Sequence, residues 1–175
     1  MTARNWNGPC AAALAAAALL WGAAGCAADG GDSSPPIVRA EEAAVALDAE
    51  IQDTDGRPHR LSADLAAGRP VALVFWQPWC GSCMAEVPTV VAAHRRFGHE
   101  MTIYGVVSGP EGSVDEDAVT KARFDTGMTY PSLRDTDLLL TRAFGVSETP
   151  TVVIVDPSKG VVYRENTAPA EWHGE

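Results

Sequence analysis

The sequence predicts one α/β domain of three layers, in which a mixed β-sheet lies between helices. Two continuous apolar runs, "VALVFW" at 71–76 and "MTIYGVV" at 101–107, are typical of strands that are covered on both faces. A helical pattern separates them, and two further strand-like runs, at 151–156 and 160–164, follow later in the chain. Strands that are connected through helices indicate parallel pairing, and the two consecutive strands at the end indicate antiparallel pairing.

The domain is predicted to begin at residue 45 with an extended segment and a hairpin turn. Apolar side chains alternate with other residues at positions 45, 47, 49 and 51, which is the period of a half-buried strand. Asp55-Gly56 is a typical two-residue hairpin turn. We therefore expect a hairpin before the strand at 71–76.

Three helices are predicted after that strand. From Cys83 onward, apolar residues recur at helical spacing; they are Met84, Val87, Val90, Val91 and Phe97. Ser113 followed by Glu116 forms a capping box, which predicts the start of a second helix. Residues 137–144 predict a short third helix that ends at Gly145.

Residues 1–25 are predicted to be a signal peptide. The wholly apolar run at 11–21 is too short to cross a membrane as a helix, which takes about 20 residues. It ends in Ala-Ala-Gly-Cys, which resembles a bacterial lipobox with Cys26 as the lipidated residue. Residues 26–44 are then expected to be the lipidated cysteine and a flexible tether, and residues 45–175 the folded domain. Ordinary cleavage that releases a soluble domain is the alternative.

Charge and cysteine count restrict the function. The chain has 13 Lys and Arg against 23 Asp and Glu, a formal charge of −10, and its basic residues form no stripe. This composition argues against nucleic acid and anionic lipid surfaces as partners. Of the four cysteines, Cys10 is expected to leave with the signal peptide and Cys26 to carry lipid. Cys80 and Cys83 then remain in the folded domain, too close in sequence to join distant segments.

Four roles compete for this cysteine pair. A zinc site needs a second pair of ligands, but the four histidines are scattered and no second CxxC exists. A copper-carrier site would need a distant histidine to join the two thiolates. A structural disulfide between these cysteines would close too small a loop to stabilise the domain by much. The fourth role is thiol–disulfide exchange, which the neighbouring sequence favours.

Cys80 lies at the predicted junction of strand and helix. There, free backbone N–H groups and the helix dipole stabilise a thiolate. A lowered thiol pKa makes a cysteine nucleophilic near neutral pH. Gly81 and Ser82 keep the turn small, so Cys83 is able to reach back and resolve a mixed disulfide formed at Cys80.

Two separated motifs resemble the thioredoxin superfamily. Residues 71–88, "VALVFWQPWCGSCMAEVP", look like its active-site strand and helix, with Trp79 before the first cysteine and Pro88 inside the helix. Residues 145–156, "GVSETPTVVIVD", resemble its cis-proline segment. The resemblance implies a thioredoxin-like sandwich, with Pro150 as the cis residue facing the dithiol, Cys80 as the exposed attacking thiol and Cys83 as the resolving thiol.

The upstream sequence "DTDGRPHRLSADLAAGRPVALVFW" together with Glu86 resembles the extracytoplasmic TlpA/ResA-like branch of this superfamily. By this resemblance, Glu86 would be a partly buried carboxylate that tunes the cysteine pKa values or relays a proton. The alternative for Glu86 is a surface helix residue in an ion pair. The backbone of Thr149 would accept a substrate strand edge-on. Trp79 would flank the site, with packing in the core as its alternative.

The resemblance implies a membrane-tethered thiol–disulfide oxidoreductase that reduces disulfides in exported proteins, apocytochrome c being one compatible substrate. A membrane electron donor would be its other partner, and neither a cofactor nor a metal is expected. The protein is expected to be extracytoplasmic and anchored as a lipoprotein. The alternative is a copper or thiol-protein chaperone that uses the same dithiol without turnover. Gly-Ser between the cysteines has no ionisable group, which favours a reductase over a strong oxidant.

The resemblance also implies a final helix, for which the sequence has no counterpart. After the strand at 160–164, the residues "NTAPAEWHGE" are too few and too broken by Pro and Gly to form that helix. An exposed apolar surface of more than a few hundred Å² usually marks an interface. We therefore expect self-association or low stability, with Trp172 lying back over the sheet as a partial lid.

Overall fold

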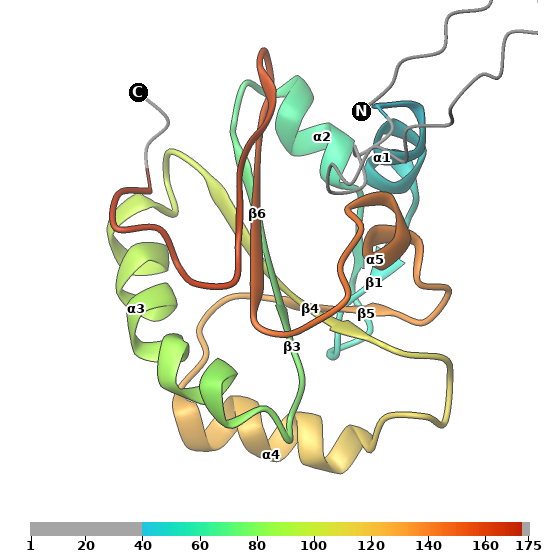
Figure 1. Ribbon diagram of the computed structural model, residues 1–175, viewed down its shortest axis with the longest axis vertical. Coiled ribbons are helices and arrows are strands. Elements are labelled where there is room, and N and C mark those ends of the chain that lie inside the picture. Colours follow the sequence, from blue (N-terminus) through green and yellow to red (C-terminus); the bar gives the residue numbers. More distant parts are fainter. Residues whose placement is uncertain (1–39, 173–175) are drawn as a thin grey trace, which may run out of the picture. The chain divides into compact units, whose positions relative to one another are not determined.

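The computed structural model describes residues 40–172, which form a mixed sheet of five strands covered by helices. The strand order is β5-β4-β3-β6-β7 (Figure 1). The strands are β3 (Val71–Trp76), β4 (Thr102–Ser108), β5 (Ser132–Asp135), β6 (Thr151–Asp156) and β7 (Gly160–Glu165). β3, β4 and β5 are parallel, whereas β6 pairs antiparallel with both β3 and β7. The predicted mixed sheet is therefore confirmed.

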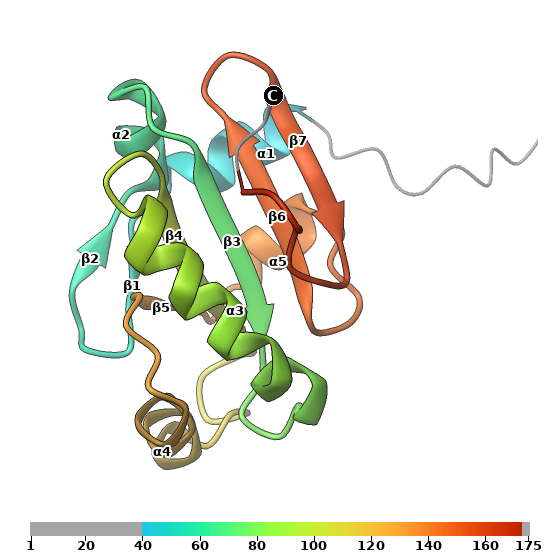
Figure 2. The ribbon, with the colours of Figure 1, turned by 90° about the vertical axis from the view of Figure 1, so that its left-hand side faces the viewer.

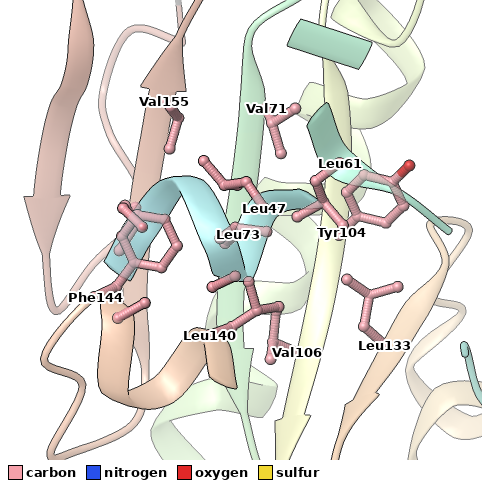
Figure 3. Close-up of a cluster of buried hydrophobic side chains, with 14 of the residues drawn as sticks. Leu47, Leu61, Val71, Leu73, Tyr104, Val106, Leu133, Leu140, Phe144 and Val155 are labelled. Carbon is pink, nitrogen blue, oxygen red and sulfur yellow. The ribbon is translucent and has the colours of Figure 1, made fainter. Parts of the chain in front are cut away.

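Helices on both faces of the sheet make the predicted three layers (Figure 1 and Figure 2). One face carries α3 (Gly81–Phe97), and the other carries α1 (Ala40–Asp48), α2 (Leu61–Ala66) and α5 (Leu139–Ala143). Every residue of β3 is buried, and its side chains alternate between the two faces of the sheet. Leu73 points to the cluster beneath α1 and α5 (Figure 3), to which Phe75 also belongs, and Val74 belongs to the cluster beneath α3. β3 is therefore the centre of the core.

The segment before the hairpin is a helix, and the first strand begins only at Ile51, so the prediction of a strand from residue 45 is wrong for residues 45–50. The buried side chains of α1 recur at helical spacing; they are Ala43, Ala46 and Leu47. Alanine has the highest helix propensity, which outweighs the alternation in this stretch. α1 also includes residues 40–44, which we expect from composition to belong to the tether. Residues 1–39, with the predicted signal peptide and Cys26, lie outside the described residues.

The predicted capping box at Ser113 is wrong, although the helix itself is present. α4 (Glu116–Thr126) has Asp115 as its N-cap, whose carboxylate accepts hydrogen bonds from the N–H groups of Asp117 and Ala118 at 3.0 and 3.2 Å. Ser113 instead donates its hydroxyl to the carbonyl oxygen of Pro110. A carboxylate is as good a cap as a serine hydroxyl and also carries the charge that a helix N-terminus favours.

β5 has no counterpart among the predicted strands, because it is short and only Leu133 in it is strongly apolar. Its last residue, Asp135, is 2% exposed and accepts a hydrogen bond from the backbone N–H of Thr141 at 2.8 Å. This contact fixes the start of α5, which lies within the helix predicted at 137–144. Gly145 follows α5 with φ +59°, as a helix stop commonly does.

Trp172 covers part of the apolar cluster beneath α3, which confirms its expected position as a lid. Residues 166–172 follow β7 without forming a helix or strand. The Trp172 side chain is 6% exposed and joins a cluster that includes Val91 of α3 and Ile154 of β6. The described part of the chain therefore covers this face with a helix and an irregular segment.

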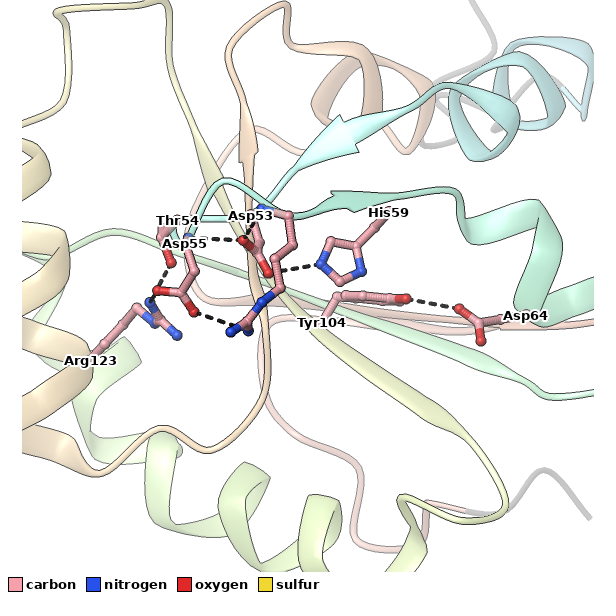
Figure 4. A network of polar contacts seen from close by, with 8 residues as sticks. Asp53, Thr54, Asp55, His59, Asp64, Tyr104 and Arg123 are labelled. Carbon is pink, nitrogen blue, oxygen red and sulfur yellow. Dashed lines mark hydrogen bonds and ion pairs between the residues drawn. The ribbon is translucent and has the colours of Figure 1, made fainter.

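A polar network joins the hairpin of β1 (Ile51–Gln52) and β2 (Pro58–His59) to the sheet (Figure 4). The hairpin turns at Asp55-Gly56, as predicted. Asp53 is 4% exposed, and its carboxylate accepts two backbone N–H groups of the turn and Nε2 of His59, the last at 2.8 Å. Nearby, the hydroxyl of Tyr104 donates to Asp64 at 2.9 Å. Burial, with the neighbouring Asp64, raises the pKa of Tyr104, so this hydroxyl keeps its proton.

Asp53→Asn is expected to remove part of the acid sensitivity of the fold. Burial alone would raise the pKa of Asp53, but hydrogen bonds from His59 and from two backbone N–H groups outweigh it and hold the pKa below its ordinary value. A depressed carboxyl pKa stabilises the fold above the ordinary value of about 4, and this contribution disappears as the pH falls through the folded-state pKa. Urea unfolding at pH 7 and at pH 3 should show a smaller stability difference in Asp53→Asn than in the wild type. An unchanged difference, equal to that of the exposed control Asp137→Asn, would contradict this.

Candidate active site

The cysteine pair lies where β3 ends and α3 begins, as predicted. The backbone N–H of Cys80 donates to the carbonyl oxygen of Gln77 at 3.0 Å, which closes a turn directly after β3. The side chain of Gln77 donates from Nε2 to the carbonyl oxygen of Ser108 at 2.7 Å, at the end of β4. The turn that carries the first cysteine is therefore fixed to two buried strands.

Cys80 is the N-cap of α3. Its sulfur accepts a hydrogen bond from the backbone N–H of Cys83 at 3.1 Å and lies 3.4 Å from Oγ of Ser82. Helix N-terminal N–H groups and the positive end of the helix dipole favour negative charge at such a position. Reduction of the pair would therefore place the Cys80 sulfur where a thiolate is stabilised, which is the condition for a nucleophilic cysteine.

The two cysteines are bonded to each other as a disulfide, with their Cα atoms 5.2 Å apart. Cys83 is 3% exposed and packs against Trp76, Val107 and Val119. Cys80 is only half-buried. Of the two sulfurs, that of Cys80 is therefore the one that a second protein can approach.

The pairing of β3 with β6 brings a second loop to the dithiol. Phe75 is paired with Thr151, so the chain that precedes β6 lies beside the chain that follows β3. The peptide bond between Thr149 and Pro150 is cis, in line with the resemblance noted above. The carbonyl oxygen of Thr149 lies 3.5 Å from the sulfur of Cys80. Residues 148–151, called here the Pro150 loop, and the cysteine pair therefore form one site.

Trp79 and Glu86 occupy different environments at this site. Trp79 is 67% exposed, so its alternative role in the core is wrong. Glu86 is half-buried on α3, and its two carboxylate oxygens accept hydrogen bonds from the hydroxyl of Thr167 at 2.9 Å and from the backbone N–H of Ala168 at 3.0 Å. Both hydrogen bonds thus join Glu86 to the segment after β7. Neither of these two partners is a cysteine of the pair or a basic residue.

Nothing in the sequence marks the residues that surround Glu86. Asn166, Thr167 and Ala168 follow the last strand in a stretch that reads as an unstructured end. Asn166 donates from Nδ2 to the carboxylate of Glu148, beside Pro150. These contacts join positions that lie far apart in the chain, so only the folded structure brings them into the site.

The described residues also bear on the zinc and copper alternatives for the cysteine pair. Within residues 40–172, no group of three or more His, Cys, Asp or Glu is arranged to hold a metal ion. His94 lies on α3 with Nδ1 at 2.9 Å from Oγ1 of Thr129, and His59 contacts Asp53. None of the helices within residues 40–172 is long and apolar enough to span a bilayer.

The sequence matches the AhpC/TSA family over residues 43–164, which is well over half of the chain. The chain therefore belongs to the AhpC/TSA family, a family of the thioredoxin fold. The matched region begins inside α1 and ends in β7, so it includes the cysteine pair and the Pro150 loop.

One relative is similar to this chain in sequence, and two solved structures share its fold. The chain is 31% identical over 121 residues to the thiol-disulfide oxidoreductase ResA of Bacillus subtilis (strain 168), covering 69% of this chain and 65% of that protein, slightly less than two thirds of its length. The structure of MTB dsbF has a TM-score of 0.61 at 27% identity, covering 71% of this chain and 88% of the other. The exposed lipoprotein thioredoxin Etrx1 of Streptococcus pneumoniae strain TIGR4 has a TM-score of 0.56 at 27% identity, with 71% and 91% covered. The thioredoxin-like fold is thereby confirmed.

Proposed function

We propose that this protein is a thiol–disulfide oxidoreductase that exchanges two electrons through Cys80 and Cys83. The observation that carries the proposal is the position of the Cys80 sulfur, which caps α3 and lies 3.5 Å from the carbonyl oxygen of Thr149. This position combines stabilisation of a thiolate with a neighbouring backbone group that is able to pair with a substrate strand. The name of the ResA relative supports the same activity.

In the reducing direction, the Cys80 thiolate attacks one sulfur of a substrate disulfide, and the other substrate sulfur leaves as a thiolate that takes up a proton. The Cys83 thiol then gives up its proton and attacks the Cys80 sulfur, so that the second substrate sulfur leaves and is protonated. The products are a substrate dithiol and the Cys80–Cys83 disulfide, which is the state in the structure. A membrane electron donor must return two electrons and two protons to complete the cycle.

The substrates that we propose are exported proteins with disulfides, and apocytochrome c is one candidate. Docking uses the backbone of Thr149 as a strand edge, and the exposed Trp79 next to Cys80 supplies an apolar contact. Glu86 tunes the cysteine pair through its negative charge on α3. The absence of an ionisable side chain between the cysteines supports the reducing direction.

We propose further that the protein works outside the cytoplasm and is held at a membrane by lipid on Cys26. The apolar run at 11–21 and the Ala-Ala-Gly-Cys sequence support this location, as does the likeness to an exposed lipoprotein thioredoxin. Mass spectrometry of the mature protein should find Cys26 as a diacylated N-terminus. A mature protein that is soluble and begins at another residue would refute the anchor.

Turnover distinguishes this proposal from the copper or thiol-protein chaperone. With excess dithiothreitol as electron donor, the protein should reduce many equivalents of insulin disulfide, and the Cys80→Ser/Cys83→Ser double variant should reduce none above background. The chaperone alternative instead predicts stoichiometric binding of copper(I) without turnover. A wild-type rate equal to that of the double variant would rule out the oxidoreductase.

A further inference from the structure

The chain that leaves β7 passes the active site. Glu165 at the end of β7 pairs with Val152 near the start of β6, so the following residues emerge beside the Pro150 loop. They then continue on the face of the sheet that carries α3 (Figure 2). Asn166 contacts the loop, and Thr167 and Ala168 contact the helix; these three residues are called here the clasp.

The first part of the clasp holds the Pro150 loop. Asn166 donates from Nδ2 to a carboxylate oxygen of Glu148. The hydroxyl of Thr151 is shared between the carbonyl oxygen of Glu148 at 2.7 Å and Oδ1 of Asn166 at 3.2 Å. Because Glu148 and Thr151 lie on either side of the Thr149–Pro150 bond, Asn166 contacts both ends of the loop.

The second part of the clasp holds α3. The carboxylate of Glu86 accepts the hydroxyl of Thr167 at 2.9 Å and the N–H of Ala168 at 3.0 Å. Tyr163 in β7 donates its hydroxyl to the carbonyl oxygen of Thr167 at 2.9 Å, which anchors the clasp to the sheet. Burial, with the charges of Glu165 and Glu86, raises the pKa of Tyr163, so its hydroxyl remains a donor.

We propose that the clasp sets the spacing between Cys80 and the Pro150 loop, with Asn166 and Thr167 as positioning residues for protein substrates. This proposal rests on the proposed function, in which a substrate strand pairs with Thr149 while its disulfide meets Cys80. The substrate must pair with Thr149 and present its disulfide to Cys80 at the same time. A small displacement of the loop relative to α3 therefore lowers the rate of exchange. A small disulfide contacts only the sulfur of Cys80 and does not depend on this spacing.

The test compares two substrates for each variant. Thr167→Val removes the hydroxyl bound to Glu86 at nearly constant volume, and Thr167→Ser keeps it. The matched control is Thr120→Val, at an exposed position on α4. The second-order rate constant of each reduced variant is measured with a disulfide-bonded peptide and with cystamine. Thr167→Val should slow the peptide reaction about fivefold, the order of one lost hydrogen bond, and leave the cystamine reaction within about twofold of the wild type.

The conservative and control variants test whether loss of the clasp contacts is what slows the peptide reaction. Thr167→Ser and Thr120→Val should keep the wild-type ratio of peptide to cystamine rates. Asn166→Ala removes the other part of the clasp and should lower that ratio as Thr167→Val does. In Glu86→Gln the amide still offers an acceptor to Ala168 and a donor to the hydroxyl of Thr167, so the ratio should be kept while the pH profile of the reaction shifts.

Two results would overturn the proposed role of the clasp while leaving the proposed function intact. One is wild-type rates with both substrates in Thr167→Val and Asn166→Ala. The other is equal slowing of the peptide and cystamine reactions in both variants, which would mean that they act on the thiols rather than on docking. If the wild type reacted with neither disulfide, the proposed function itself would fail, and the role of the clasp with it.

Discussion

Cys80→Ser is expected to reduce insulin turnover to the rate of the uncatalysed reaction. A serine hydroxyl neither attacks a disulfide at neutral pH nor forms a mixed disulfide with one. Cys83 cannot replace the lost nucleophile, because it is 3% exposed and covered by residues such as Trp76 and Val119. The measurement is insulin reduction by dithiothreitol in the presence of each variant, with circular dichroism to show that the fold is kept.

Cys83→Ser should behave differently from Cys80→Ser, although both lack turnover. The Cys80 thiolate remains at the start of α3 and still attacks the substrate, but no second thiol is present to resolve the product. A mixed disulfide with substrate should therefore accumulate on non-reducing gels in Cys83→Ser alone. Faster alkylation of Cys83 than of Cys80 in the reduced wild type would reverse the assignment.

Trp172→Ala is expected to lower the free energy of unfolding by about 3 kcal/mol, as the loss of a large buried side chain does. The side chain is 6% exposed and packs in the cluster beneath α3, on the face where the described chain has no further helix. Urea unfolding measures the loss. Light scattering of the same samples should show more self-association in the variant, because the exposed cluster becomes an interface.

Trp79→Ala is the matched control for stability. It removes the same side chain at a position that is 67% exposed, where a substitution changes stability by less than about 0.5 kcal/mol. Equal stability losses in the two variants would mean that Trp172 is no lid. A wild-type protein that is already dimeric or barely stable at neutral pH would show that residues 166–172 do not cover the face adequately.

The parts of the fold that could be predicted are those with a strong local signal. β3, β4 and β6 are continuous apolar runs because both faces of the central strands are buried. β5 lies at the sheet edge and contains Arg134 and Asp135, so its sequence has no such run. α1 has apolar residues compatible with two periods, and only packing against the core makes residues 43, 46 and 47 its buried set.

The candidate site likewise has one part that the local sequence predicts and another part that it does not. The chemistry of Cys80 depends on a local feature, the N-terminus of the helix that Cys80 caps, and this feature can be predicted from the residues around it. The environment of Glu86 depends on Thr167 and Ala168, which are distant in sequence and carry no pattern that links them to α3. The position of the cysteine pair at the helix N-terminus can therefore be predicted from the sequence, whereas the contacts of Glu86 with distant residues cannot.

The reduction potential of the Cys80–Cys83 couple tests the central claim most directly. The protein is equilibrated with glutathione or dithiothreitol buffers of known potential, and the thiol and disulfide forms are separated after acid quenching and alkylation. We expect a two-electron couple at or below about −230 mV, towards the value of about −270 mV for thioredoxin, because no ionisable side chain separates the cysteines. A couple near about −120 mV, typical of a strong oxidant, or cysteines that do not equilibrate with the buffer, would contradict the assignment as a reductase.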